Sequence, residues 1–600
     1  MKRMPSKLFG RFIAPVAAGV LALFIVSFSG CSREAPAEVF VHLTSAPSTM
    51  TINQSVSLIA SVGNDPSAAG VDWSCSGAAC GAFSLSHTPS GAATVFTAPA
   101  SPGTMTVTAT STADATAEAS IAITVVPIGS NAMLNGRYVF FVQGVDGAGA
   151  YAAAGAIVAD GDGHITAGEQ DYANESIQAG PDALTGTYAI GPDGRGSITL
   201  NVNNPNLPLN GIETFSIALT STTHALIIQF DGSANSSGNL DLQAASALDP
   251  GAIGGAFAFT SQGVQILDQV PITFGGVLIM SASSGAITSG TYFENNGGVT
   301  FQSATTGSLT TPDAFGRGTL ALSVGVDFAY YAVQGQVLRL IQTDVPSFMT
   351  GGSMFGQGDA GLTATFSNAS LAGSYAFSHA GGTGFGPLAM AGQFAADGAG
   401  NFSAGASDLN NAGLASFASI AGASRYTISG NGVGTLRLPP IVDQRGSVSD
   451  LLIFAVAPDI NLFDPTSAVG GGGALIMDID PGAVASGYIV PQTAGVFNGN
   501  YAVNLQYVGA AGEVDFVGQS VAAGGALTGT VDINEAGLTS AGLSLTGTFM
   551  ADAVNAGRLS GTFIVNGRTH QIVFYQVSGT LLVIVDVDGA DIGIGIMEKE

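Results

Sequence analysis

The segment "LNGRYVFFVQG" at residues 134–144 decides the fold, because the chain repeats its pattern three more times. "IGGAFAFTSQG" begins at Ile253, "LAGSYAFSHAG" at Leu371 and "FNGNYAVNLQY" at Phe497. In each copy a glycine comes two residues before an aromatic residue, and the apolar residues that follow are typical of a β-strand. Similar strands at a regular interval indicate duplicated domains.

The similarity continues through each repeat. "GAIVADGDGHITAG" at Gly155 matches "GQFAADGAGNFSAG" at Gly392, and "GRGSITL" at Gly194 matches "GRGTLAL" at Gly316. Each repeat then reaches an apolar strand that closes on aspartate, written "LIIQFD", "LRLIQTD", "INLFD" and "LLVIVD" in turn, before a final strand. The predicted domains are residues 132–247, 251–360, 369–480 and 495–600.

The first repeat predicts eight strands joined by short turns such as "DGDG" and "PDG". The extended runs are residues 137–144, 151–160, 164–174, 184–190, 195–203, 212–220, 224–231 and 238–244. Neighbouring strands should be antiparallel, and a meander without covering helices hides its edges by closing into a barrel or folding into a sandwich. We expect an all-β chain with four eight-stranded barrels, each filled by side chains or holding one small ligand.

Residues 39–127 predict a separate β-sandwich, because short Thr, Ser and Val alternations are broken by turn residues. "GVDWSCSGAACGAF" and the later "FTAPASPGTMTVTATS" resemble bacterial Ig-like domains of exported proteins. The resemblance implies that Trp73 lies in the core. We expect Cys75 and Cys80 to form a disulfide outside the cytoplasm; metal binding and a free dithiol are the alternatives.

The N-terminus predicts an exported protein. Basic residues precede the apolar stretch "FIAPVAAGVLALFIVSF", and "FSGC" follows it. This string resembles the lipobox of bacterial lipoproteins, which implies a signal peptide at 1–30, a lipidated Cys31 and a linker at 31–38. By the same resemblance Ser32 favours the outer membrane, while an ordinary signal peptide or a single membrane anchor remains the alternative. The lipobox, Ig-like domain and Gly-rich β-repeats together resemble envelope lipoproteins of soil bacteria.

Composition limits the partners. Asp and Glu outnumber Lys and Arg by 42 to 15, which gives a net charge of -27. Such a surface repels nucleic acid and anionic lipid headgroups, so no nucleic-acid partner is expected. The hydrophobic fraction of 46% is enough for packed cores rather than a disordered chain.

One loop has carboxylates at the spacing of a calcium site. In "DGDGHITAGEQD", which runs from Asp160 to Asp171, Ile165 takes the place where the sharp turn of such a loop needs glycine. The equivalent segments of the other repeats mostly lack the acids. A β-hairpin turn explains all four copies, and calcium is the alternative for this one.

Arginine recurs at one position of the repeats, as Arg195, Arg317 and Arg558, with Val433 in the third. These arginines suit an anionic ligand or, preferably, an ion pair with a nearby carboxylate. The strand-ending Asp231, Asp344 and Asp586 are the expected partners.

No catalytic constellation is evident. The histidines His42, His87, His164, His224, His379 and His570 lie singly, without the spacing of a zinc site, and there is no G-x-S-x-G motif. Paired carboxylates for glycoside cleavage meet only in the fold, so the sequence leaves them open. We therefore predict no enzymatic activity, no cofactor and no metal.

The sequence favours a non-enzymatic envelope lipoprotein, anchored through Cys31, whose repeats bind a polysaccharide or surface protein by multivalent contacts. Each repeat is expected to fold on its own, so that an excised fragment of residues 132–247 unfolds cooperatively. Two alternatives remain. One is that the barrels are carriers of small apolar ligands, and the other is that the repeats form one large barrel in the outer membrane.

Overall fold

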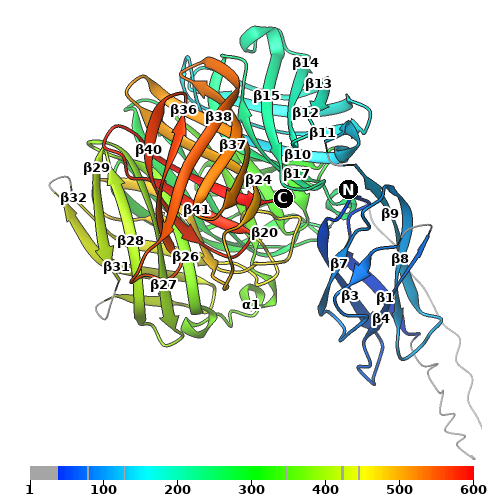
Figure 1. Ribbon diagram of the computed structural model, residues 1–600. Helices are drawn as coiled ribbons and strands as arrows, with labels where there is room; N and C mark the ends of the chain where they lie inside the picture. The colour runs from blue at the N-terminus through cyan, green and yellow to red at the C-terminus, as the bar shows by residue number, and fades with distance from the viewer. Residues whose placement is uncertain are drawn as a thin grey trace, which may run out of the picture.

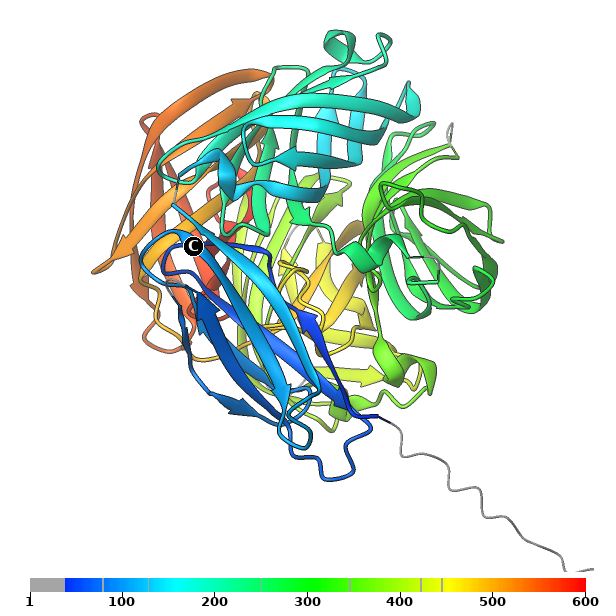
Figure 2. The same cartoon turned by 90° about the vertical axis from the view of Figure 1, so that its right-hand side faces the viewer.

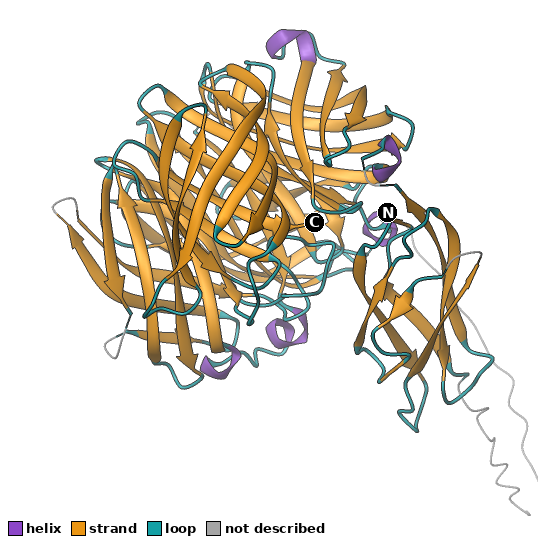
Figure 3. Cartoon of the chain, viewed as in Figure 1, coloured by secondary structure: helices purple, strands orange, loops and turns teal. Residues whose placement is uncertain are grey.

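The computed structural model describes residues 38–77, 80–127, 129–249, 251–344, 347–420, 424–443 and 446–600. The regular structure of the described chain is almost all β-strand, in agreement with the predicted fold class (Figure 1, Figure 3). Its helical segments are short: η1 (Asn131–Met133), η2 (Pro208–Gly211), η3 (Ala245–Leu248), α1 (Gly358–Leu362) and η4 (Asn368–Ser370). Among the described residues, no helix is long and apolar enough to cross a membrane.

The N-terminal unit is a sandwich of two sheets. One sheet has the order β1 (Phe40–Ser45), β3 (Ser55–Gly63), β7 (Ala93–Thr97) and β5 (Ala82–Phe83). The other has the order β2 (Thr49–Thr51), β9 (Glu118–Val126), β8 (Gly103–Ser111), β4 (Val71–Gly77) and β6 (His87–Thr88). Trp73 is 5% exposed between the sheets, and its Nε1 donates to Thr88 at 3.0 Å. Trp73 is thus a core residue.

The first repeat closes into a barrel of eight antiparallel strands, as the sequence predicts. The strands are β10 (Asn135–Asp146), β11 (Gly149–Asp160), β12 (His164–Asn174), β13 (Gln178–Ile190), β14 (Arg195–Val202), β15 (Ile212–Leu219), β16 (His224–Gln229) and β17 (Ala234–Leu242). The repeated aromatic residue Tyr138 is buried inside this barrel and donates its hydroxyl to the Thr222 carbonyl at 2.7 Å.

The second and fourth repeats form closed barrels with the same strand order. The second has β18 (Gly255–Gln265), β19 (Val270–Met280), β20 (Ala286–Asn296), β21 (Val299–Leu309), β22 (Arg317–Leu322), β23 (Val326–Gln334), β24 (Val337–Gln342) and β25 (Phe348–Gly356). The fourth has β35 (Gly499–Gly509), β36 (Gly512–Ala523), β37 (Ala526–Glu535), β38 (Leu538–Ala551), β39 (Arg558–Val565), β40 (Arg568–Gln576), β41 (Leu581–Asp586) and β42 (Ile592–Lys599).

The third repeat keeps this order but differs from the predicted eight-stranded closed barrel: its described residues form a nine-stranded sheet that is not closed, which we call the third barrel below. Its strands are β26 (Ala372–Thr383), β27 (Gly386–Asp397), β28 (Phe402–Asn411), β29 (Leu414–Ser419), β30 (Arg425–Ile428), β31 (Val433–Asp443), β32 (Gly446–Ala455), β33 (Ala474–Asp478) and β34 (Ala483–Pro491). β29 and β30 together occupy the place of the single strand β13 in the first barrel. The structure does not describe residues 421–423 between them.

Two details of the third repeat correct the sequence prediction. "INLFD" at residues 460–464 lies in the loop between β32 and β33, and "ALIMD" at residues 474–478 is the strand in its place. Ile460 and Leu462 are apolar because they pack against neighbouring barrels, not because they pair in a sheet. The repeat therefore extends past residue 480, since β34 pairs with β26.

The four barrels pack side by side as a closed ring, with the sandwich beside the first barrel (Figure 2). β11 contacts β25, β19 contacts β34, β27 contacts β42, and β36 of the last barrel contacts β15 of the first. The described strands pair only within their own repeat, whereas one large barrel would require strands of different repeats to pair. Each barrel interior is filled by its own cluster of buried side chains, which gives the ligand-carrier alternative no support.

Asparagines at one position of the repeats hold three of the four ring contacts. Asn295, Asn410 and Asn534 each donate from Nδ2 to backbone carbonyls of the next barrel, at 2.7 to 3.0 Å. Each amide is inserted beside the turn before the last strand of its neighbour. Because these donors and acceptors are buried, separating the barrels exposes polar groups that are satisfied only in the ring.

Candidate functional site

The repeated arginines lie at the contacts between barrels. Arg317 of the second barrel binds Asp171 of the first through two hydrogen bonds, of 2.6 and 2.8 Å. The Tyr331 hydroxyl donates to the same carboxylate at 2.8 Å. The Asp171 side chain is 5% exposed, so this charge is buried and fully paired.

The same arrangement recurs around the ring. Between the third and fourth barrels, Arg558 binds Asp408 with two hydrogen bonds of 2.8 Å, and Tyr575 donates to it at 2.5 Å. Between the fourth and first barrels, Arg195 donates to Asp532 at 2.9 Å, and Ser216 donates to it at 2.6 Å. The ion pairs that the sequence predicts are present, and each arginine has a partner in the adjacent barrel. Arg195 and Arg558 also pair within their own barrels, with Asp193 at 2.8 Å and Asp552 at 3.0 Å.

The predicted partners Asp231, Asp344 and Asp586 are therefore wrong. Asp231 instead accepts from backbone amides of Thr214 and Ser233 within its own barrel. The arginines lie at the start of the fifth strand on the outer face of their barrels, where a carboxylate on the third strand of the preceding barrel is within hydrogen-bond distance.

The contact between the second and third barrels replaces all three polar groups together. Phe293 occupies the position of Asp171, Val433 that of Arg317, and Phe454 that of Tyr331. Phe293 and Phe454 pack with ring centroids 5.7 Å apart. A buried charge without its partner is costly, so the loss of the arginine requires the loss of the aspartate as well.

Side chains from all four barrels meet near the ring centre. His224 and Asp241 come from the first barrel, Arg339 from the second, Asp464 from the loop of the third and Glu598 from the fourth. Asp241 contacts His224 Nδ1 at 2.7 Å and Arg339 Nη2 at 2.6 Å, while Glu598 lies 3.0 Å from His224 Nε2. Sequence reasoning missed this cluster, because its members come from four separate repeats.

The electrostatics of the central cluster favour a charged histidine. Burial alone opposes protonation of His224, but the carboxylates of Glu598, Asp464 and Asp241 outweigh it and hold its pKa well above the usual value. Burial alone would raise the pKa of Asp241. The positive charges of Arg339 and His224 outweigh burial and hold this pKa below its usual value. The side chains of His224 and Asp241 have no exposed area, so we interpret the cluster as a structural junction rather than a ligand site.

An open groove of about 650 Å³ lies between the third and fourth barrels. Ala415, Ser416 and Phe417 of β29 line one side of it, and β38, β39 and β40 line the other. Phe417 is 50% exposed and Met550 is 71% exposed. The Arg558–Asp408 ion pair also lines the groove, with the Arg558 guanidinium carbon 5.2 Å from the centre of the Phe417 ring.

The groove combines apolar and uncharged polar groups. Thr548, Ser560, Thr562 and Gln571 supply hydroxyl and amide groups beside Phe417 and Met550. Thr548 and Thr562 lie across adjacent strands with their hydroxyl oxygens 3.2 Å apart. Since Arg558 and Asp408 neutralise each other, the groove presents little net charge to a ligand.

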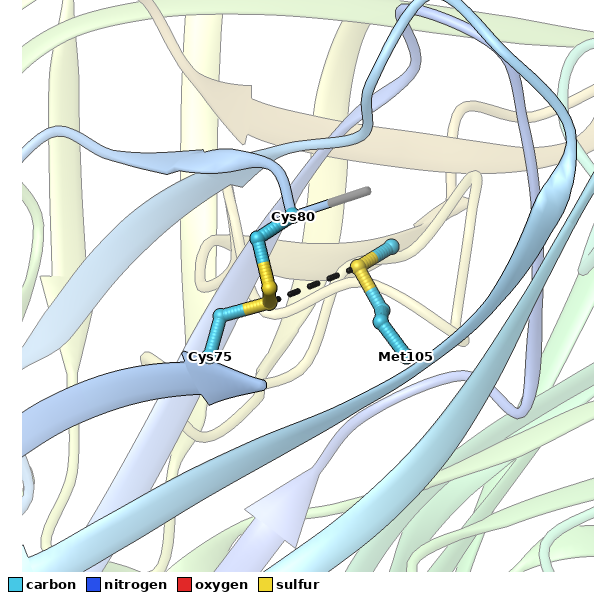
Figure 4. Close-up of a disulfide and its surroundings, with 3 residues drawn as sticks. All are labelled: Cys75, Cys80 and Met105. Atoms are coloured by element: carbon cyan, nitrogen blue, oxygen red, sulfur yellow. Dashed lines mark hydrogen bonds between the residues drawn. A yellow bond between two sulfur atoms is a disulfide. The ribbon is translucent and has the colours of Figure 1, made fainter. Parts of the chain in front are cut away.

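The two cysteines of the sandwich are joined. Cys75, on β4, and Cys80 form a disulfide with their Cα atoms 5.9 Å apart, next to the sulfur of Met105 (Figure 4). It links the end of β4 to the segment before β5. Cys31, the predicted lipidation site, lies outside the described residues.

The two aspartates at the ends of the calcium-like pattern have different structural roles. Asp160 accepts from the backbone amides of Asp162 and His164 at 2.8 and 3.0 Å, which lowers its pKa to about 2 and forms a hairpin turn. Asp171, at the other end of the pattern, is in the ion pair with Arg317. The hairpin interpretation thus accounts for the aspartate that opens the pattern.

The six histidines have different surroundings. His87 and His164 each contact an aspartate at 2.9 Å near the surface. His379 is buried inside the third barrel, and burial lowers its pKa to about 4. His570 lies with two aspartates at the end of the fourth barrel. His42 is on β1.

Comparison with protein-family models and with curated proteins finds no match. Among solved structures, kievitone hydratase from Nectria haematococca is similar at 12% identity and a TM-score of 0.17, over 59% of this chain and 92% of that chain. A mutant of the vaccine antigen Transferrin Binding Protein B from Haemophilus parasuis is similar at 8% identity and a TM-score of 0.13, over 77% of this chain and 76% of that chain. Likenesses this low carry no argument about function, which is therefore argued from the site.

Proposed function

We propose that the chain is a non-enzymatic binding protein of a bacterial envelope, anchored through Cys31, and that it binds a neutral polysaccharide in the groove between its third and fourth barrels. The groove is the observation that carries this proposal. It is open, lies between two barrels of the ring, and has an exposed aromatic side chain beside hydroxyl and amide groups. Sugars present apolar faces and hydroxyl groups, which match these two kinds of surface.

The charge of the chain supports an uncharged ligand. The net charge of -27 repels anionic polymers, and the one arginine in the groove is already paired with Asp408. A neutral chain meets neither obstacle. The open groove also suits a polymer that continues beyond the site at both ends.

The ring changes the predicted mode of binding. The sequence suggested four equivalent modules, but the groove has an exposed aromatic ring that the corresponding position at the contact between the second and third barrels lacks. Gln302 of the second barrel occupies the position of Phe417, since each pairs with the equivalent residue of the preceding strand. We therefore propose one site per chain at this groove in place of four weak equivalent sites.

The groove is tested by Phe417→Ala. We expect at least a tenfold loss of affinity for neutral polysaccharide, measured by isothermal titration after a glycan array identifies a ligand, because the exposed ring is the largest apolar surface on its side of the groove. The loss corresponds to about 1.4 kcal/mol, within the range of interface hot spots.

Phe301→Ala is the matched control, because Phe301 is a 55% exposed phenylalanine on the equivalent strand of the second barrel. It should bind like the unchanged chain. Equal affinities for the Phe417 and Phe301 variants, or binding to anionic glycans alone, would contradict the proposed site.

The anchor is tested separately by Cys31→Ala. We expect this variant to lose labelling by a fatty-acid analogue and to leave the membrane fraction, because several acyl chains hold a protein on a membrane where one is marginal. Cells expressing the unchanged chain provide the comparison. A variant that is still labelled and still sediments with membranes would show that Cys31 is not the lipidation site.

A further inference from the structure

Three potential metal ligands converge at one end of the fourth barrel. His570 is on β40, Asp586 ends β41, and Asp591 directly precedes β42. Their exposed fractions are 2%, 0% and 1%. One ligand atom of each residue lies within 4.8 Å of the other two, so the fold brings together three residues that no sequence motif connects.

One oxygen of each aspartate is occupied and the other faces the histidine. Asp586 Oδ1 accepts from the Asp588 amide at 2.8 Å, and Asp591 Oδ1 accepts from Arg568. Asp586 Oδ2 is hydrogen-bonded to His570 Nδ1 at 2.9 Å, a contact that a bound cation would replace, and Asp591 Oδ2 lies 3.3 Å from the same nitrogen. Arg568 therefore orients one ligand without covering the atom that faces the cluster.

Asp591 Oδ2 is a second, independent observation. This atom is buried and has no hydrogen-bond partner, although its residue is only 1% exposed. Buried carboxylate oxygens are nearly always satisfied, so an oxygen that makes no hydrogen bond and faces two other ligand atoms is a candidate cation ligand.

We infer that His570, Asp586 and Asp591 bind a divalent transition-metal cation of the Zn²⁺ type. The donor set of one imidazole and two carboxylates suits Zn²⁺, whereas Ca²⁺ and Mg²⁺ select oxygen ligands alone. In a tetrahedral site with bonds of 2.0 to 2.2 Å, ligand atoms lie about 3.3 to 3.6 Å apart. The distance of 3.3 Å from His570 Nδ1 to Asp591 Oδ2 fits that spacing, and the 2.9 Å contact to Asp586 Oδ2 would lengthen on binding.

The proposed cation site lies in the turn of the fourth barrel that contacts the third barrel. Asn410 donates to the carbonyls of Asp586, Asp588 and Asp591, so the same turn supplies two ligands and receives the ring contact. Gln571, next to His570, lines the groove.

The site is tested on the mature full-length chain after treatment with a chelator. We expect one equivalent of Zn²⁺ to bind, measured by competition with a zinc-sensitive dye, and the melting temperature to rise on addition of Zn²⁺. Asp591→Asn keeps an acceptor for Arg568 and should bind Zn²⁺ at least tenfold more weakly, as should His570→Gln. The control His164→Gln alters another histidine that contacts an aspartate at 2.9 Å and should leave binding unchanged.

X-ray absorption at the zinc edge of the unchanged protein provides a readout that needs no variant. We expect one nitrogen and two or more oxygen ligands near 2.0 to 2.1 Å. Failure of the unchanged chain to bind Zn²⁺, sulfur in the absorption spectrum, or equal affinities for the unchanged chain and both triad variants would overturn the inference. Loss of binding in the His164 variant would place the metal elsewhere.

Discussion

Arg339→Met is expected to lower the free energy of unfolding by about 3–5 kcal/mol, because it leaves a buried carboxylate without its strongest partner. Arg339 donates to Asp241 at 2.6 Å and to Ser353 at 2.9 Å, and the side chains of Arg339 and Asp241 are 4% and 0% exposed. Without the guanidinium, His224 alone offsets the negative charge of Asp241. His224 is at the same time in contact with the acids Asp464 and Glu598. Urea-induced unfolding of the mature chain measures the loss.

The matched control is Arg437→Met, the same change at a surface ion pair. The Arg437 side chain is 68% exposed and lies 3.2 Å from Asp450, so its removal should cost no more than about 1 kcal/mol. If the two variants unfold at the same urea concentration, the central cluster does not hold the ring together.

The strands of the repeats could be predicted because the same pattern is written four times. Gly136 and its three counterparts mark the first strand, and short turns then set an antiparallel order that each barrel follows. One strand of the third repeat could not be placed correctly, because the apolar segment at residues 460–464 resembles a strand. Local composition does not distinguish a residue buried in a sheet from one buried between domains.

The ring could not be predicted, because an outward-facing residue has the same position in the strand whether it meets solvent or another barrel. Small residues such as Ala152 and Ala154 gave no sign that their face is covered. A signal was nevertheless present. Val433 lacks the arginine of the other repeats, and Phe293 in the preceding repeat lacks the aspartate. Comparing neighbouring repeats in pairs would have connected these two changes.

The candidate sites show the same limit. The groove depends on two repeats lying side by side, and the triad of His570, Asp586 and Asp591 depends on three strands of one barrel. Residues that meet only through barrel closure or ring closure have no fixed spacing in sequence. The disulfide between Cys75 and Cys80 could be proposed from sequence because its cysteines are close along the chain.

The ring also changes what we expect of an excised repeat. From sequence alone, residues 132–247 should fold as a soluble monomer. In the structure, Val139 and Ala154 of this barrel pack against the second barrel, and Leu226 and Ile228 pack against the fourth. Excision exposes both of these apolar faces together with Asp171, whose partners Arg317 and Tyr331 lie in the second barrel. Exposed apolar patches of this kind cause association.

We therefore expect the excised fragment of residues 132–247 to aggregate, with no monomer peak in size-exclusion chromatography, whereas the mature chain remains monodisperse. Leu226→Thr with Ile228→Thr should restore part of the soluble fraction, because both side chains lie outside the barrel and their replacement leaves its interior core intact. If the unchanged fragment is monomeric and unfolds in urea with a sigmoidal transition, this expectation is wrong. The barrels would then be independent domains, and the ring would be an assembly that forms only after each of them has folded.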